Sequence, residues 1–594
     1  MKKFDKMVPK RNKEENVKTL KRLYSYIKNY KVFLFGGIIL TVLSNIGNLL
    51  APKLVEICID KIEKTLPNVD MTKVLSIAGL MLSFYIVTYI LSILLSTTML
   101  KLGQSIGYEL RKATFLKFDR LPVSYFDTNQ TGDVISRFTY DVDMISSSIG
   151  QTYVSFATSM ITLIGSFYMM VTQNPVLMIS FVITVPASIC FGKYMSKKAR
   201  TYNREKSKKT GELNGFVEDK ISGYKAIKVY SQQSNIMKKF TQKNNDWALA
   251  NYNSEAKARG FLVSGTQFIT QLATVLIYIH SAYLLYHSKI TLAQISSFIL
   301  YSKMFTEIVN ELSYLIADLQ ISLATADRVF DLIDEEEEKN DDETSIDIDD
   351  FKGEVSIKNV GFMYDSNRKI LNNINIEAKP NNIVAIVGHT GAGKTTLINL
   401  LMRFYHVNEG SISFDGHNIE NLSKKSLRSA CAMVLQDTWL FSGTIFENIA
   451  YGKENTTLEE VIEVAKAVSL HEYVTSMPNG YDTLITEDSV NISQGQKQLI
   501  TIARAMLLNS KILILDEATS NVDTLTEINV QNAMKELMRN KTTFVIAHRL
   551  STIKNANSIL LFENGEIVER GNHEELMDLD EKYAKLYNSQ FEMA

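Results

Sequence analysis

At 594 residues the chain is too long for one folding unit, because single domains usually hold about 100–200 residues. Lysine and arginine (64) balance aspartate and glutamate (65), so the net charge of −1 gives no reason to expect a nucleic-acid partner. Three isolated cysteines, Cys58, Cys190 and Cys431, match no metal-binding or disulfide spacing.

The first 31 residues form a basic segment, with eleven Lys and Arg against three acidic residues. Within it, Leu20, Tyr24 and Ile27 recur at helical spacing. Residues 17–31 are therefore predicted to form an amphipathic "elbow" helix along the inner leaflet of a membrane. A solvated basic tail is the alternative.

Six long apolar stretches follow, each long enough to cross a hydrocarbon core of about 30 Å as a helix. They cover residues 32–54, 74–100, 151–171, 175–196, 260–285 and 292–316. A buried helix of a soluble protein explains any single stretch, but six in succession predict a helical membrane domain over residues 32–325.

The connections between these spans alternate in length, and the two long ones, residues 102–148 and 197–257, are basic. Positively charged connections stay on the cytoplasmic side, so we expect these and the N-terminus in the cytoplasm. Few Gly or Pro residues interrupt them, which predicts helices that continue past the bilayer.

The sixth span carries charges. Lys303, Glu307 and Glu311 recur every four residues and share one helical face. A charge at mid-bilayer costs about 2.5–3.5 kcal/mol even on the gentler insertion scale, which argues against a lipid-facing position. The three side chains either line a water-filled substrate pathway or pair with other groups of the protein, and the residues alone leave both open.

An acidic linker, residues 326–352, separates this half from the rest of the chain. From residue 353 to residue 594, short β-rich runs alternate with helical stretches, the pattern of an α/β domain with a mainly parallel sheet. A glycine-rich loop after the β-rich run 382–388 fits the G-x-x-x-x-G-K-[ST] pattern, whose amides and lysine bind nucleotide phosphates. The expected ATP-binding residues are Gly388, His389, Thr390, Gly391, Ala392, Gly393, Lys394, Thr395 and Thr396, with the Thr395 hydroxyl also on Mg²⁺.

Two acidic residues end another buried run, at residues 511–516. Asp516 is expected to hold Mg²⁺, and Glu517 to orient and polarise the attacking water. His548 follows a third strand end and is a candidate contact for the γ-phosphate. Ser493 and Gly495 begin a helix whose amides suit a phosphate held by a second copy of the domain.

Taken together, these residues resemble the ATP-binding cassette (ABC) transporters. The resemblance implies that Tyr364 stacks on adenine, that Gln436 contacts Mg²⁺ and assists catalysis while sensing the membrane domain, and that His548 is the switch histidine. Residues 492–496 are similar to the signature sequence, and residues 520–523 to the D-loop. They add Gln496 and Asp523 to the implied nucleotide contacts.

The resemblance extends to the membrane half, where residues 121–145 and 215–233 are similar to the intracellular loops of exporters. The implied fold is a membrane domain of six transmembrane helices (the type I exporter, or type IV, fold) joined to an α/β P-loop nucleotide-binding domain. Such a half-transporter must dimerise. Gln494 stands in the signature sequence where glycine is commonest. This variant is similar to those of bacterial multidrug exporters that work as heterodimers in the plasma membrane, and a homodimer is the alternative.

The implied function is an ATPase that exports amphipathic, drug-like compounds from the cytoplasm or inner leaflet by alternating access. A lipid or peptide exporter of the same architecture is the alternative within transport. An ATP-gated channel or regulator without turnover belongs to another class, and Glu517 argues against it because a pure gate needs no catalytic carboxylate. A P-loop enzyme with a membrane anchor is a third class, for which six spans are too many.

Overall fold

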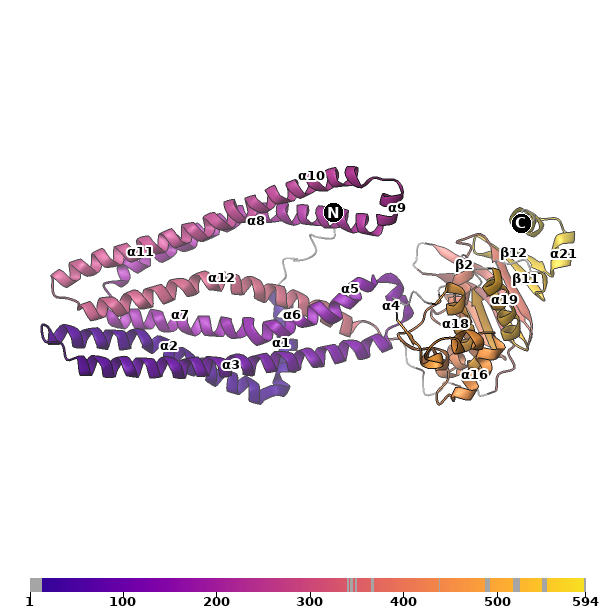
Figure 1. The fold of residues 1–594 in the computed structure, drawn as a ribbon, viewed down its shortest axis with the longest axis horizontal. Coiled ribbons are helices and arrows are strands. Elements are labelled where there is room, and N and C mark those ends of the chain that lie inside the picture. Colours follow the sequence, from indigo (N-terminus) through magenta and orange to yellow (C-terminus); the bar gives the residue numbers. More distant parts are fainter. Residues whose placement is uncertain are drawn as a thin grey trace. The chain divides into compact units, whose positions relative to one another are not determined.

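The computed structural model describes residues 13–338, 341, 346–347, 350–364, 368–436, 438–486, 492–516, 524–546 and 553–591. The chain divides into two compact units, which are drawn in Figure 1. The first comprises Met1–Asp119 with Thr131–Glu335, and the second comprises Arg120–Gln130 with Glu336–Ala594. A short stretch of the membrane half is thus part of the second unit.

The described part of the first unit is built from long helices that run side by side (Figure 1). They are α1 (Lys13–Ile27), α2 (Lys31–Thr65), α3 (Met71–Arg120), α5 (Thr131–Ser136), α6 (Val142–Ser147), α7 (Tyr153–Gln173), α8 (Met178–Ser222), α9 (Tyr224–Val229), α10 (Gln233–Tyr252), α11 (Phe261–Tyr286) and α12 (Leu292–Asp334). Helix α12 packs mainly on α7 and α2, whereas α8 packs on α10 and α11.

Each of the six predicted spans lies in a helix. Among the described residues, four helical stretches are long and apolar enough to cross a membrane: Val17–Thr65, Met71–Arg120, Thr131–Gln173 and Gln233–Tyr286. They contain the first, second, third and fifth predicted spans, and α8 and α12 cover the fourth and sixth. The apolar part of α12 holds the three charges Lys303, Glu307 and Glu311, which lower its hydropathy.

The prediction that the long connections are helical is confirmed. Helices α3 and α8 extend past their predicted spans to Arg120 and Ser222. Helix α12 likewise continues to Asp334, so the first residues of the predicted linker, 326–334, are helical. The helix in this part of the chain was expected from the sequence, and Ala326, Val329 and Phe330 bury its apolar face.

The N-terminal helix α1 is anchored on the end of α12. Its Leu23 side chain is buried, and the Arg22 guanidinium binds the Asp334 carboxylate while lying 4.3 Å from the centre of the Phe330 ring. The amphipathic helix is therefore confirmed over Lys13–Ile27. It packs on protein through Thr19 and Leu23, whereas Leu20 and Tyr24 of the predicted apolar face are exposed.

The second unit holds a six-stranded sheet of order β12-β11-β3-β10-β9-β6, a four-stranded antiparallel sheet of order β2-β1-β4-β5, and the pair β7-β8. The strands are β1 (Val355–Met363), β2 (Lys369–Ala378), β3 (Ile383–Gly388), β4 (Glu409–Phe414), β5 (His417–Asn418), β6 (Cys431–Val434), β7 (Gly443–Thr444), β8 (Leu484–Ile485), β9 (Ile512–Asp516), β10 (Thr542–Ile546), β11 (Ser558–Glu563) and β12 (Glu566–Gly571). The helices are α4 (Val123–Thr128), α13 (Lys394–Leu401), α14 (Lys424–Ser429), α15 (Ile445–Ala450), α16 (Leu458–Ala467), α17 (His471–Thr475), α18 (Gln494–Leu508), α19 (Thr524–Met538), α21 (His573–Asp578) and α22 (Lys582–Phe591).

The larger sheet is parallel except for β12, as the sequence predicts, and both of its faces are buried. Along β3, Ala385 and Val387 pack on the helices α15, α16, α18 and α19, whereas Val384 and Ile386 pack on α13 and the smaller sheet. Burial on two faces explains why its central strands are nearly continuous apolar runs.

Candidate functional site

The glycine-rich loop joins β3 to the start of α13 at the carboxyl edge of the larger sheet. Its backbone needs glycine at two places. At Gly388 (φ +148°) a Cβ atom would lie 2.3 Å from the carbonyl oxygen of Phe562, and at Gly393 (φ +102°) it would lie 2.7 Å from Leu371 Cδ2. Only glycine fits these two positions, and glycine-rich loops before a helix are the kind of backbone that binds phosphates.

Burial divides the loop into a tip and a base. His389, Thr390, Gly391 and Thr395 are exposed, and Ala392, Gly393, Lys394 and Thr396 are buried. An exposed tip above a buried cationic base is a cradle open to a phosphate chain.

Lys394 lies beneath this tip and is 9% exposed. Its Nζ atom donates to the carbonyl oxygens of Gly388 at 2.7 Å and His389 at 3.0 Å. Burial lowers the pKa of the Lys394 ammonium, and the nearby Asp516 carboxylate opposes that shift. The loop thus holds a desolvated cation whose bonds to two carbonyls are exchangeable for bonds to phosphate oxygens.

The order of the strands places Asp516 at the same carboxyl edge of the larger sheet as the loop. Strand β10 lies between β3 and β9, and Ile546 at its end pairs with both Ile386 and Asp516. On the other side of β9, β6 ends at Val434, two residues before the exposed Gln436. The ends of four neighbouring strands therefore gather the loop, Asp516 and Gln436 at one edge of the sheet.

The oxygen atoms of Thr395, Asp516 and Gln436 fit Mg²⁺, which prefers hard oxygen ligands. Among the described residues no group of three or more His, Cys, Asp or Glu side chains could hold a metal by itself.

Three of the predicted site residues lie outside the described residues. They are Glu517, Asp523 and His548. Glu517 directly follows the end of β9, and His548 comes two residues after the end of β10. Their expected roles stay predictions.

Tyr364 has an aromatic setting next to the loop. It is 49% exposed, and its hydroxyl donates to Thr396 Oγ1 at 3.2 Å. Its ring meets the Phe362 ring edge-on at 4.8 Å and the Tyr405 ring edge-on at 4.9 Å. Two buttressing rings and one hydroxyl bond hold Tyr364 as a platform with an open side, which suits stacking of a flat base.

Tyr405 also joins this platform to α4. Its hydroxyl donates to Asp127 Oδ2 at 2.6 Å, a bond within the second unit. Burial and the Asp127 carboxylate raise the pKa of the Tyr405 hydroxyl, so it stays a proton donor. Sequence analysis missed this pair, because nothing in the local pattern connects residues 278 positions apart.

The residues predicted to act on a second nucleotide begin α18. Ser493 Oγ accepts from the Gln496 amide at 3.3 Å, and Gln496 Oε1 accepts from the Ser493 amide at 2.9 Å, which closes a capping box. Gln494 donates to Thr438 Oγ1 at 3.1 Å, and Gly495 is buried. Among the described residues, these hydrogen bonds of the first turn of α18 do not reach the glycine-rich loop.

A second candidate site lies in the first unit, on the face of α12 that does not pack on α2 and α7. Phe298 and Tyr301 are fully buried on the packed face, and the Tyr301 hydroxyl donates to the carbonyl oxygen of Leu49 at 2.8 Å. Lys303, Glu307 and Glu311 are all exposed. The three charges share one side of the helix, as predicted, and Glu311 lies nearest to α7, where it accepts from the Ser159 hydroxyl at 3.5 Å.

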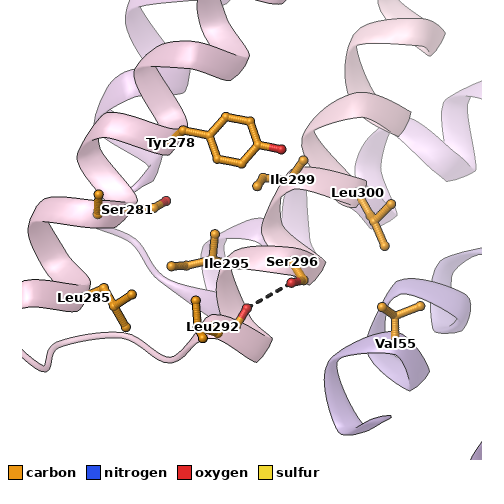
Figure 2. A pocket seen from close by; sticks show the side chains of 10 residues that line it. Val55, Tyr278, Ser281, Leu285, Leu292, Ile295, Ser296, Ile299 and Leu300 are labelled. Carbon is orange, nitrogen blue, oxygen red and sulfur yellow. Dashed lines mark hydrogen bonds between the residues drawn. The ribbon is translucent and has the colours of Figure 1, made fainter. Parts of the chain in front are cut away.

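A groove of about 560 Å³ opens at the end of this face where α11 and α12 are connected (Figure 2). It is lined by Val55 of α2, by Tyr278, Ser281, Ala282 and Leu285 of α11, and by Leu292, Ile295, Ser296, Ile299 and Leu300 of α12. Figure 2 shows the Ser281 hydroxyl pointing into it. Ser281 is 1% exposed, and its hydroxyl has no hydrogen-bond partner among the described residues.

A buried carboxylate fixes α2 to α7 and α12. Glu56 accepts from Lys53 Nζ at 2.7 Å, from Ser297 Oγ at 2.9 Å and from the Gln173 amide. Sequence analysis missed Glu56, since it lies just past the predicted end of the first span, whereas α2 continues to Thr65.

We expect Glu56→Ala to destabilise the first unit by about 2–4 kcal/mol, because it removes the acceptor that Lys53, Gln173 and the buried Ser297 hydroxyl share. Thermal unfolding of the purified protein in detergent measures this, and Glu56→Gln should retain part of the lost stability. The matched control is Asp60→Ala on the same helix, which breaks a more exposed pair with Lys64 at 2.9 Å and should cost about 0–1 kcal/mol. Equal losses for Glu56→Ala and Asp60→Ala would contradict the assigned role of Glu56.

Two family profiles match the two halves of the chain. The profile described as ABC transporter transmembrane region matches residues 34–309, and the profile described as ABC transporter matches residues 371–520. A solved structure titled as a bacterial Atm1-family ABC exporter with ATP bound superposes with a TM-score of 0.76 at 26% identity, covering 94% of this chain and 98% of that chain.

Two relatives match along most of their length. The uncharacterized ABC transporter ATP-binding protein YfiC of Bacillus subtilis is 35% identical over 98% of this chain and 96% of its own. The fatty acid ABC transporter ATP-binding/permease protein of Mycobacterium bovis is 41% identical over 78% of this chain and 73% of its own.

Proposed function

The chain belongs to the ABC exporter family, and from that premise we propose that it is a half-transporter for amphipathic organic compounds, which it moves out of the cytoplasm or inner leaflet by alternating access. The observation that carries the proposal is the exposed face of α12, where the apolar groove adjoins Lys303, Glu307 and Glu311 within one membrane helix. Such a face suits a ligand with an apolar body and a polar group. The relative named for fatty acids supports an amphiphile.

The second unit supplies the driving force, since the chain is an ATPase coupled to transport. We infer that Lys394 and the amides of residues 388–395 bind the triphosphate, and that Tyr364 receives the adenine. Glu517 is the residue that orients the attacking water and accepts its proton, and His548 contacts the γ-phosphate.

Thr395, Asp516 and Gln436 would hold Mg²⁺. When bound, the ion supplies positive charge to the β- and γ-phosphate oxygens. Gln436 lies two residues past the end of β6, at the edge of the sheet. We propose that its side chain contacts the ion and senses the state of the membrane domain.

The partner chain completes each nucleotide site in this proposal. Ser493, Gly495, Gln496 and Asp523 of one chain face the nucleotide held by Lys394 of the other. Closing the two ATPase units on nucleotide must shift the membrane domain between inward and outward states, and a 1:99 to 99:1 shift needs about 5.5 kcal/mol. The N-terminus and the ATPase unit lie in the cytoplasm, with the helices in a bacterial plasma membrane.

We propose a heterodimer, because Gln494 departs from the usual signature glycine. Purified alone, the chain is then expected to hydrolyse ATP slowly, and co-expression with a neighbouring half-transporter is expected to restore turnover. Full turnover by the chain alone would establish the homodimer instead.

The Tyr405–Asp127 bond gives a test of coupling between nucleotide and α4. We expect Tyr405→Phe to lower amphiphile-stimulated ATP turnover by up to about tenfold with little change in ATP affinity, because a hydrogen bond to a carboxylate contributes about 1.5 kcal/mol. Asp127→Asn should do the same. The control Tyr481→Phe removes a hydroxyl that bonds to His471 Nδ1 at 2.9 Å in the same unit and should change nothing. A lowered ATP affinity with normal stimulation would assign Tyr405 to base binding alone.

Transport itself is tested in inside-out membrane vesicles with a fluorescent amphipathic dye. Accumulation of dye is expected only with hydrolysable ATP. Dye flux that needs ATP binding but continues with a non-hydrolysable analogue would favour the gated channel, and ATP hydrolysis without movement of any amphiphile would reject the proposed substrate class.

A further inference from the structure

The exposed face of α12 changes from apolar to charged in a fixed order. Leu292, Ile299 and Leu300 line the groove, Lys303 comes one turn after Ile299, and Glu307 comes one turn after Lys303. Residues four apart lie on the same side of a helix, with Cβ atoms about 5–6 Å from each other. The face therefore presents hydrocarbon first, then a cation, then an anion.

The groove itself has the size of a small-molecule site. Its volume of about 560 Å³ lies within the range of about 300–1,000 Å³ that is usual for ligand pockets. Its aliphatic lining suits a hydrocarbon chain, and the buried Ser281 hydroxyl points into it (Figure 2). A buried hydroxyl that lacks a protein partner gains from a ligand oxygen.

The charges beyond the groove are not neutralised by described residues. Lys303 and Glu307 have no ion pair with any described side chain, whereas Glu311 accepts from the Ser159 hydroxyl of α7 at 3.5 Å. Inside a membrane-spanning segment, charges of this kind need a counter-charge or water. Lys303 and Glu307 are thus the two groups ready to meet a ligand.

We propose that this face binds a zwitterionic amphiphile in which an acidic group stands between the hydrocarbon chain and an amine. The chain occupies the groove, the acidic group meets Lys303 and the amine meets Glu307. This inference rests on the proposed export of amphipathic compounds and names their class.

The order of the charges excludes the simpler ligands. A cationic amphiphile would place its charge beside Lys303, and an anionic one would meet Lys303 but leave the Glu307 carboxylate without a counter-charge. A zwitterion of the opposite order, with the amine next to the chain, is repelled at both positions. Only the order chain–acid–amine is complementary at every step.

The experiment compares two single-chain zwitterions of equal chain length, lysophosphatidylethanolamine (chain–phosphate–amine) and an alkyl sulfobetaine (chain–ammonium–sulfonate). The purified transporter is placed in phosphatidylglycerol nanodiscs, with each probe at the same low mole fraction. The readout is ATP turnover relative to each protein's own basal rate. For the unmodified protein we expect half-maximal stimulation at about tenfold less lysophosphatidylethanolamine than sulfobetaine, a difference of about 1.4 kcal/mol.

The decisive variant is the double exchange Lys303→Glu with Glu307→Lys. It keeps the composition and the net charge of the face but reverses the order of the two charges. The preference is therefore expected to reverse in favour of the sulfobetaine. Structural damage does not produce such a gain. Leu300→Trp, which fills the groove, should weaken stimulation by both probes, and Ile316→Trp, on the same helix outside the groove, should not.

Two results would overturn the inference: equal responses to both zwitterions in the unmodified protein, or an unchanged preference in the double exchange. If neither the zwitterions nor a fatty acid nor an alkylamine stimulates turnover, the proposed export of amphiphiles fails as well. If fatty acid or alkylamine stimulates while the zwitterions are not distinguished, export of amphiphiles stands and only the charge order is wrong.

Discussion

Lys394→Ala is expected to reduce ATP turnover by about 10³-fold, the effect of removing a preorganised charge from a phosphate site. The ammonium is buried beneath the loop and already bonded to two carbonyl oxygens, so no other described lysine shares its place. ATP binding should weaken too, because charge-assisted bonds to the triphosphate are lost. Turnover is measured as phosphate release from the purified dimer, and binding by retention of labelled ATP.

Lys541→Ala is the matched control for Lys394. Lys541 is 8% exposed, and burial lowers its pKa as it does for Lys394, but it precedes β10 at the opposite end of the strand from the site. It should retain turnover if it folds, which thermal unfolding checks. Normal ATP-driven dye transport by Lys394→Ala, with nucleotide no longer bound, would refute the proposed mechanism.

Glu517→Gln is expected to reduce turnover by about 10²–10⁴-fold while ATP stays bound, because the amide cannot take a proton from water. The two ATPase units should then accumulate in the closed, ATP-loaded dimer. Labelled ATP retained without product release measures this state.

Glu536→Gln serves as the control for Glu517. Glu536 is an exposed carboxylate on α19 that pairs with Arg539, and its loss should leave turnover unchanged. If Glu517→Gln hydrolysed ATP at the normal rate, the carboxylate would have another role and the gated channel would regain support.

Local patterns were enough to predict where the glycine-rich loop lies in the fold. The loop follows β3 directly and its glycines adopt conformations that other residues avoid, so the motif and the geometry occupy the same eight residues, Gly388–Thr395. Asp516 required one more step, the assumption that buried runs pair in a parallel sheet, and β9 and β3 do flank β10.

Contacts between distant segments could not be predicted from the sequence. Tyr405 and Asp127 are ordinary residues in their own segments, and only the fold brings them within 2.6 Å. Glu56 was missed for a different reason. An apolar window ends where the first charges appear, but α2 continues, and the packing of α7 and α12 buries the carboxylate. The groove has no sequence signal at all, because its lining residues are the common residues of any membrane helix.

Residues 120–130 belong to the second compact unit although their neighbours on both sides belong to the first. During synthesis this segment leaves the ribosome long before residues 336–594 are translated. Helix α4 can therefore pack on the rest of its unit only when translation is almost complete. A C-terminal fragment that starts at residue 353 would in turn lack α4 and leave the Tyr405 hydroxyl without its acceptor. The last third of the chain alone therefore lacks one contact of the ATPase unit, and the order of translation makes the packing of α4 on that unit a late event.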